Sequence, residues 1–262
     1  MMIMENNNQS LEHIYGINAI TTLLEINAGH RKIYEIIISD RRKQDKRIKD
    51  ILQLASKREI KVRIAGEQDF RSLAGEEKSI QNIIARVSAY NTGDFDHYIE
   101  NNIHPGSKLM ILDGITDIGN FGSIIRNCYA FGFDGIILPK KRSVSLNRKV
   151  SKISAGALEG ISIFMVTNLT RAIKKLKTAG FWIYGTTLEK DKKIRDIADT
   201  DFVFPLALVM GSEDKGMSRI VTDNCDVLIS IRLTGRMQSL NVSMASGIIL
   251  YYLQEKHKGE KT

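Results

Sequence analysis

Three segments of the chain combine glycine with hydrogen-bonding side chains. They are 119–126 (GNFGSIIR), 211–216 (GSEDKG) and 239–243 (SLNVS). Two apolar runs typical of strands, 206–210 and 227–231, lead directly into 211–216 and the loop 234–239. Ligands of parallel sheets bind in loops at the carboxyl ends of strands. We therefore predict that these loops form the active site.

Each polar residue in these segments also has a structural interpretation. Asn120 and Ser239 precede helix-like stretches, where both residue types are preferred N-caps. Glu213 could be a solvated loop residue. Arg126 could be a surface charge, but Ile124, Ile125 and Cys128 surround it, and an arginine in an apolar segment usually has an anionic partner.

The second half of the chain is predicted to be a parallel α/β domain that spans 108–262. Its strand-like runs are apolar throughout, which indicates burial on both faces of a parallel sheet. Besides the two runs above, they are 109–112, 135–138, 161–166 and 182–185. Helices are expected over 121–131 and 169–177.

The first half is predicted to be a small α/β domain over 12–90, because helical and strand-like patterns alternate there. Helices are expected from about 15 to 29, over 45–58 and over 67–73, with strands at 33–38, 60–64 and 80–87. Residues 1–11 are expected to be a disordered tail. Residues 91–107 are interpreted as a linker with a short helical turn over 95–100.

The chain has 262 residues, a net charge of +8 and a pI near 9.4. This balance suits a polyanion such as nucleic acid, although many basic proteins have no such partner. The chain contains two runs of basic residues, and each is either a solvated face or a phosphate-binding patch. The second run is the better candidate for phosphate binding, because it directly follows a strand. The candidate nucleic-acid-binding residues are Arg41, Arg42 and Lys43 in the first run, and Lys140, Lys141, Arg142 and Arg148 in the second.

Several classes of protein are disfavoured. No GxGxxG, GxxxxGK[ST] or GxSxG motif and no Cys/His cluster with metal spacing is present. Cys128 and Cys225 are too few for a disulfide framework and are interpreted as core residues, and His97 and His104 as surface residues. There is no signal peptide and no apolar run that could span a membrane, so we expect a soluble, cytoplasmic protein.

Together the three segments resemble the motifs of the SpoU (TrmH-type) RNA ribose 2′-O-methyltransferases. The matching residues are Asn120-x-Gly-x-x-x-Arg126, the 209–216 loop and Ser239-Leu240-Asn241-Val242-Ser243, in the family's order. Residues 15–20 and the 81–87 strand are similar to the substrate-binding domain of the subgroup that methylates a guanosine ribose in 23S ribosomal RNA. That strand usually carries His-Gln-Gly, where this chain has Ile80-Gln81-Asn82.

The resemblance implies a fold and a set of partners. It implies a C-terminal trefoil knot in the catalytic domain and a homodimer. It also implies that S-adenosylmethionine lies in the knot, held by Met210, Gly211, Ile231 and Leu240. Its sulfonium methyl is already activated, so no metal is expected. The same chemistry on transfer RNA, and a non-catalytic RNA-binding assembly factor, remain alternatives.

The resemblance also assigns catalytic roles. Arg126 is central, and because arginine is not normally deprotonated in proteins we interpret it as a fixed positive charge rather than a base. Asn120, Ser239 and Asn241 would orient the ribose and the guanidinium. Glu213 would pair with Arg126 or position the cofactor loop.

Overall fold

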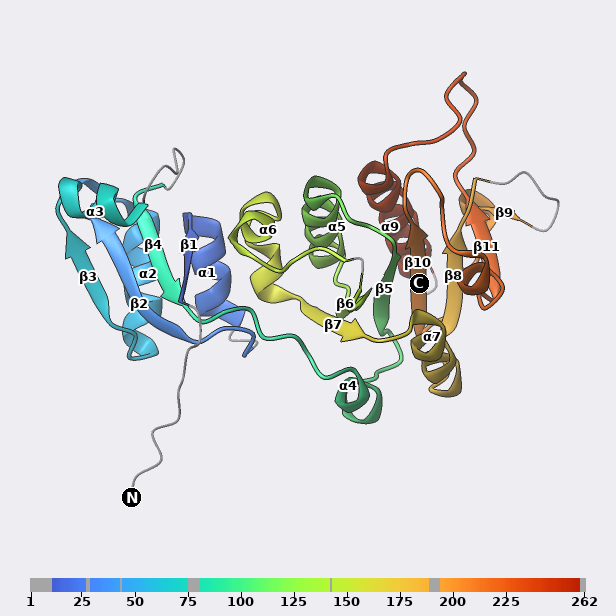
Figure 1. The fold of residues 1–262 in the computed structure, drawn as a ribbon, viewed down its shortest axis with the longest axis horizontal. Coiled ribbons are helices and arrows are strands. Elements are labelled where there is room, and N and C mark those ends of the chain that lie inside the picture. The colour runs from blue at the N-terminus through green and yellow to red at the C-terminus, as the bar shows by residue number, and fades with distance from the viewer. Residues whose placement is uncertain are drawn as a thin grey trace. The chain divides into compact units, whose positions relative to one another are not determined.

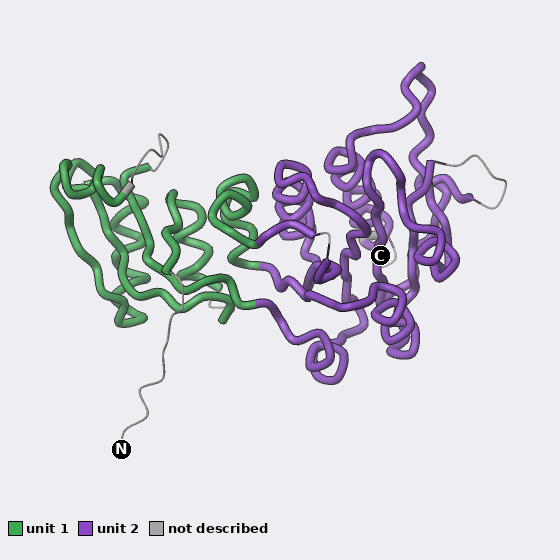
Figure 2. Tube along the Cα trace, viewed as in Figure 1, with its two compact units in different colours: residues 1–91, 146–160 green, residues 92–145, 161–262 purple. Residues whose placement is uncertain are grey.

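The computed structural model describes residues 11–26, 29–42, 44–74, 81–141, 143–188 and 194–259. The chain divides into two compact units (Figure 2). Unit 1 contains Met1–Asn91 and Leu146–Gly160, and unit 2 contains Thr92–Ser145 and Ile161–Thr262. The segment 146–160 therefore groups with the first half of the chain, although we predicted it within the catalytic domain. Of the expected tail, only Leu11 is described, and it is exposed.

Unit 1 is built on a four-stranded mixed sheet in the order β1-β4-β2-β3 (Figure 1). β4 is antiparallel to β1 and β2, whereas β2 and β3 are parallel. The predicted helices and strands are confirmed within the described residues, and β1 is an additional strand that was not predicted. The elements are β1 (Glu12–Tyr15), α1 (Ile17–Ile26), β2 (Ile33–Ser39), η1 (Asp40–Arg42), α2 (Lys46–Lys57), β3 (Val62–Ala65), α3 (Glu67–Ala74), β4 (Ile83–Val87), α6 (Arg148–Ile153) and η2 (Ala157–Gly160).

The two faces of this sheet carry different cores. Alternate strand residues, among them Ile36 and Ala85, pack with α1 and α2 on one face. Ile37 and Ile84 point to the other face, where α3 covers them with Phe70. α3 covers only part of that face.

Unit 2 contains a seven-stranded sheet in the order β7-β6-β5-β10-β8-β11-β9, and every strand pair in it is parallel. This confirms the predicted parallel α/β domain. Its elements are α4 (Phe95–Asn101), β5 (Lys108–Asp113), α5 (Ile118–Ala130), β6 (Gly135–Pro139), β7 (Ser162–Val166), α7 (Leu169–Thr178), β8 (Trp182–Thr186), β9 (Arg195–Asp196), η3 (Ile197–Asp199), β10 (Leu206–Gly211), α8 (Arg219–Thr222), β11 (Val227–Ser230) and α9 (Val242–Gly259).

Helices lie on both faces of this sheet. α4, α7 and α8 share one core with alternate residues of the central strands, such as Ile111 and Val209. α4 lies within the segment interpreted as a linker, but its Phe95 and Tyr98 are buried in that core. α5 and α9 pack together. The trefoil knot remains a prediction. No helix in the described residues is long and apolar enough to cross a membrane.

Candidate active site

The carboxyl ends of β5 and β10 lie side by side at the centre of the sheet. Asp113 is the register partner of Gly211. The two following loops therefore start at the same edge, and Asp113 Oδ2 joins them by accepting a hydrogen bond from the Ser218 amide at 2.7 Å. Two of the three predicted segments meet here because adjacent parallel strands end together.

The loop after β10 folds tightly back on itself. Ser212 and Gly216 exchange backbone hydrogen bonds of 3.1 and 2.9 Å. A Cβ on Gly211 would lie 2.0 Å from the carbonyl carbon of Gly216, so the loop needs glycine at 211. The close approach is made by the loop's own backbone, at Gly216 and Met217.

Glu213, presented by this turn, gathers the polar residues of the other two segments. Its Oε1 accepts hydrogen bonds from Asn120 Nδ2 at 3.2 Å and from the Val242 amide at 3.1 Å. Asn241 Nδ2 also donates to Glu213 Oε1, and to Asn120 Oδ1 at 2.9 Å. Three candidate residues therefore form one connected cluster, and a hydrogen bond that ends on a carboxylate oxygen is stronger than one between two amides.

The helix caps differ from those considered on sequence grounds. α5 begins earlier than expected, and Asp117 is its N-cap, accepting from the Asn120 amide at 2.7 Å. Asn241, rather than Ser239, caps α9, because its Oδ1 accepts from the amides of Ser243 at 2.9 Å and Met244 at 3.4 Å. The Asn120 side chain is thereby free to reach Glu213.

Arg126 points away from the buried side of α5. Its neighbours Ile124, Ile125 and Cys128 are fully buried, whereas Arg126 is exposed. Within the described residues its guanidinium has no hydrogen-bond or ion-pair partner, so it does not pair with Glu213. An exposed and unpaired guanidinium leaves its fork of donors available to an anion from outside the chain.

Asn127 connects the helix of Arg126 to the helix that Asn241 caps. Its Nδ2 donates to the Ser243 carbonyl at 3.0 Å and to Ser246 Oγ at 2.8 Å. Sequence analysis did not select Asn127, because an amide within a helix has no pattern that reveals a partner more than a hundred residues away.

A cavity of about 330 Å³ opens at the same sheet edge. The four predicted cofactor residues, Met210, Gly211, Ile231 and Leu240, all line it, as do Glu213 and Ser239. Thr186 and Leu188 at the end of β8 line it as well and were not predicted. The rule that ligands bind at carboxyl ends of parallel strands could have indicated them.

The candidate RNA-binding residues have different environments. Arg41 pairs with Glu67, and Arg42 pairs with Asp45 at 3.2 Å. Lys140 and Lys141 are exposed after β6 in unit 2, whereas Arg148 begins α6 in unit 1, so the second basic run is divided between the units. Lys43 and Arg142 lie outside the described residues.

The cysteines and histidines take no part in this site. Burial raises the pKa of Cys225 to about 12 and that of Cys128 further, so both thiols stay protonated near pH 7. His104 Nε2 lies 3.3 Å from Asp134 Oδ1. In the part of the chain that the structure describes, no three His, Cys, Asp or Glu side chains group as a metal site.

Two family models cover most of the chain. Residues 107–251 match the SpoU rRNA methylase family. The chain belongs to this family. Residues 13–93 match the domain described as RNA 2′-O ribose methyltransferase substrate binding. Membership confirms the predicted class of enzyme, an RNA methyltransferase with a separate substrate-binding domain.

Individual relatives and a solved structure are also similar to this chain. The SpoU family member described here is 36% identical over 239 residues to the 23S rRNA (guanosine-2′-O-)-methyltransferase of Ralstonia nicotianae, covering 91% of this chain and 93% of that one. It is 39% identical over 211 residues to a Staphylococcus haemolyticus protein assigned to the TrmH family of tRNA/rRNA methyltransferases, covering 80% and 83%. The fold matches the SpoU methyltransferase AviRb from Streptomyces viridochromogenes in complex with AdoMet, with a TM-score of 0.76, 22% identity and coverage of 98% and 95%.

Proposed function

We propose that this protein transfers a methyl group from S-adenosylmethionine to the 2′-hydroxyl of a ribose in RNA, and that its target is a guanosine in 23S ribosomal RNA. The observation that carries the proposal is the cluster of Asn120, Glu213 and Asn241 at the rim of the cavity lined by Met210 and Leu240. The Ralstonia relative, named for this reaction, supports the choice of target.

The cavity fits S-adenosylmethionine by size and lining. Its volume of about 330 Å³ lies within the range of roughly 300–1,000 Å³ typical of small-molecule sites. Met210, Ile231 and Leu240 offer an apolar wall for an adenine ring, and Thr187, Ser230 and Ser239 offer polar groups. The complex of AviRb with AdoMet agrees with this assignment.

The chemistry divides between the methyl donor and the residues of the chain. When bound, S-adenosylmethionine supplies a methyl group attached to a sulfonium sulfur. That sulfur is a leaving group that needs no further activation. Arg126 supplies a fixed positive charge beside the attacking hydroxyl and its neighbouring phosphate, which stabilises the developing alkoxide. The proton passes to phosphate or water.

The Glu213 cluster acts by positioning. The carboxylate holds the amides of Asn120 and Asn241, and these in turn fix the starts of α5 and α9 relative to the loop after β10. A rigid frame of this kind keeps reacting groups aligned, and a displacement of 1 Å can cost about a hundredfold in rate. We assign contact with the ribose to Ser239, which lines the cavity.

The test uses tritiated S-adenosylmethionine with unmodified 23S ribosomal RNA, 16S ribosomal RNA and bulk transfer RNA, each with wild-type protein and Arg126→Ala. We expect alkali-stable ribose label in 23S RNA alone, and only with wild type. Label in transfer RNA would show that the substrate is transfer RNA and not 23S RNA. The name of the Staphylococcus relative also allows this outcome. Failure to bind S-adenosylmethionine in calorimetry would favour the non-catalytic assembly factor.

A homodimer is part of the proposal. α9 exposes Met244 at 62% and Tyr251 at 54%, seven residues apart and so on one side of the helix. An exposed apolar stripe of this kind favours burial against a second copy. A monomer in light scattering at micromolar wild-type protein would contradict it, and Tyr251→Lys should weaken the dimer.

A further inference from the structure

A row of charged residues crosses the part of the unit 1 sheet that α3 leaves open. His13 on β1 is the register partner of Arg86 on β4, and Arg86 is the partner of Glu35 on β2. Lys61 and Arg63 extend the row at β3, where both pair with Glu35. We call His13, Lys61, Arg63 and Arg86 the basic row.

The basic row lies on the same face as the small core under α3. Arg86 is two residues from Ile84, and Glu35 is two residues from Ile37, and side chains two apart in a strand share a face. Ile84 and Ile37 pack against Phe70 of α3. The sheet face is therefore apolar where α3 covers it and basic where it is open.

Cations outnumber carboxylates in this row. Arg86 Nη1, Lys61 Nζ and Arg63 Nε lie 3.3, 3.5 and 3.7 Å from Glu35, the one carboxylate that pairs with them in the described part of the chain. The Glu35 side chain is 7% exposed, whereas those of Arg86, Arg63 and Lys61 are 39%, 39% and 75% exposed. Three positive charges above one buried negative charge leave a net charge of about +2 facing solvent.

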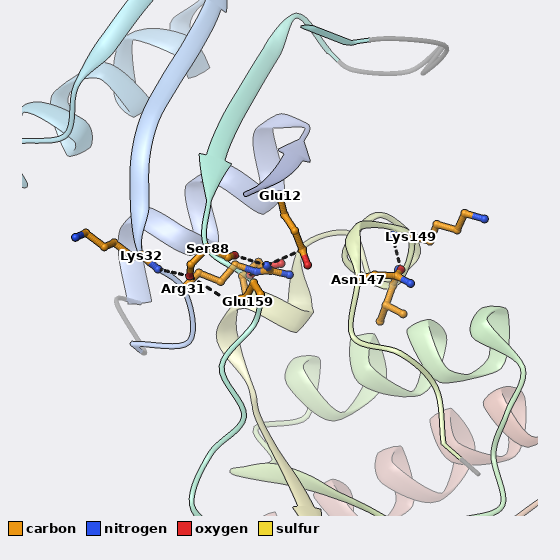
Figure 3. Close-up of polar contacts among 9 residues, drawn as sticks. Glu12, Arg31, Lys32, Ser88, Asn147, Lys149 and Glu159 are labelled. Carbon is orange, nitrogen blue, oxygen red and sulfur yellow. Dashed lines mark hydrogen bonds and ion pairs between the residues drawn. The ribbon is translucent and has the colours of Figure 1, made fainter. Parts of the chain in front are cut away.

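Arg148 adds a further charge beside this row. The segment that carries it is fixed to unit 1 by a buried ion pair, because Arg31 Nε lies 2.9 Å from Glu159 Oε2 and both side chains are fully buried (Figure 3). Arg31 Nη1 also donates to Glu12 Oε2 and to the Ser88 carbonyl, both at 2.8 Å. These bonds join the ends of β1, β2 and β4 to η2, which contains Glu159.

Arg148 lies close to the His13 end of the row, because α6, which begins at Arg148, packs against β1, the strand of His13. Burial lowers the pKa of His13, and the positive charges of Arg86 and Arg148 lower it further. The imidazole is therefore neutral at pH 7, and the positive charge of the surface comes from the lysine and the arginines around it.

We propose that the basic row and Arg148 form the surface of unit 1 that binds the phosphate backbone of the RNA substrate. The inference rests on the proposed function as an RNA methyltransferase and names the surface that holds the RNA away from the reacting ribose. A polyanion suits these residues because Lys61, Arg63 and Arg86 share one carboxylate, which balances only one of their three charges. Arg41 and Arg42, by contrast, already have a carboxylate each.

The test compares two variants that lose the same number of positive charges. The row variant is Lys61→Gln/Arg63→Gln/Arg148→Gln, which leaves Arg86 to pair with Glu35. The control is Lys46→Gln/Lys49→Gln/Lys57→Gln, all at exposed positions of unit 1. Binding of unmodified 23S RNA is measured by filter retention between 50 and 200 mM KCl, with S-adenosylmethionine affinity measured by calorimetry.

The row variant should bind RNA roughly tenfold to 100-fold more weakly, because it loses phosphate contacts. Its plot of log K against log salt should also be less steep, because each lost contact reduces the magnitude of the negative slope by about 0.7–0.9. The control should keep the wild-type slope. Equal slopes for the row variant and wild type, or an equal loss in the control, would overturn the inference. If the triple variant misfolds, Lys61→Gln alone should reduce the magnitude of the negative slope by about 0.7–0.9.

Failure of this inference is distinguishable from failure of the proposed function. If wild-type protein methylates RNA and the row variant does so with unchanged KM, the surface is wrong and the enzyme assignment stands. If wild-type protein neither binds S-adenosylmethionine nor labels any RNA, the proposed function fails. The row variant should raise KM for RNA and keep kcat, because it leaves the residues at the cavity unchanged.

Discussion

Glu213 Oε1 accepts a hydrogen bond from Asn120 Nδ2 at 3.2 Å, although the two residues are 93 positions apart in the chain. Asn241 Nδ2 donates to the same oxygen. One carboxylate thus joins the loop after β10 to the first turns of α5 and α9, which carry the other residues of the site.

Removing the Glu213 carboxylate should impair catalysis through the positions of the two asparagines. In Glu213→Ala the amide donors of Asn120 and Asn241 lose their common acceptor, so we expect kcat to fall by about a hundredfold. Glu213→Gln keeps a carbonyl acceptor and should recover part of this loss. Single-turnover methyl transfer at saturating RNA measures both, and equal rates for the two variants would refute the positioning role.

Arg126 should be needed for activity and not for stability. Its guanidinium is exposed and makes no hydrogen bond or ion pair within the described residues. The unfolding free energies of Arg126→Ala and Arg126→Lys should therefore both lie within about 0.5 kcal/mol of the wild-type value. Arg126→Lys should not restore the rate, because an ammonium lacks the planar fork. Chemical denaturation and methyl transfer are measured together, and wild-type activity in Arg126→Lys would show that the fork is irrelevant.

Gly211 should tolerate no side chain. A Cβ there would lie 2.0 Å from the Gly216 carbonyl carbon and 2.1 Å from the Met217 nitrogen, so Gly211→Ala must displace the loop that lines the cavity. We expect S-adenosylmethionine affinity to fall by tenfold or more, on the order of 1.4 kcal/mol. The matched control is Gly66→Ala, since nothing lies within 4 Å of a Cβ at that position. Normal calorimetric binding by Gly211→Ala would contradict the assignment of the cavity.

Asn127→Ala should weaken the connection between α5 and α9. It removes the donor to the Ser243 carbonyl and to the buried Ser246 hydroxyl, which should cost about 1–3 kcal/mol of unfolding free energy. Because α5 carries Arg126 and α9 follows Asn241, kcat should fall as well. Asn127→Asp retains an acceptor but loses the donors, so it should not rescue either quantity, and a full rescue would indicate that the donors are unimportant.

The buried pair of Arg31 and Glu159 should give a pH-dependent stability once it is broken. Burial raises the pKa of Glu159, and the charge of Arg31 opposes that rise. In Arg31→Met the opposing charge is gone, so at pH 7 the unfolding free energy should fall by about 3–5 kcal/mol.

The sign of the pH dependence follows from proton binding. A carboxyl group whose pKa is higher in the folded state than in the unfolded state binds more protons when folded, so stability falls as the pH rises above the unfolded value of 4.5. Urea unfolding of Arg31→Met between pH 4.5 and 8 should show this decline. Arg31→Met/Glu159→Leu should recover stability, and its unfolding free energy should no longer decline as the pH rises. A decline that persists in this double variant would exclude Glu159 as its source.

Local patterns in the sequence were sufficient for six of the seven strands in the parallel sheet of unit 2; β9, with two residues, was not predicted. Runs such as 109–112 and 206–210 are apolar throughout, and the structure buries them on both faces of β5 and β10. Such runs can be recognised because burial on two faces is a property of each strand by itself. The three motifs were recognisable for a similar reason, since each is contiguous in the chain.

Only the tertiary structure decided which groups meet. Capping of α5 by Asp117 frees Asn120 for Glu213, and the pair of Arg31 and Glu159 spans 128 positions and assigns 146–160 to unit 1. Neither contact leaves a periodic signal, because a hydrogen bond between distant residues depends on how strands and helices pack and not on local composition. The basic row was hidden for the same reason: His13, Lys61 and Arg86 lie in different parts of the chain, and strand pairing alone brings them into one line.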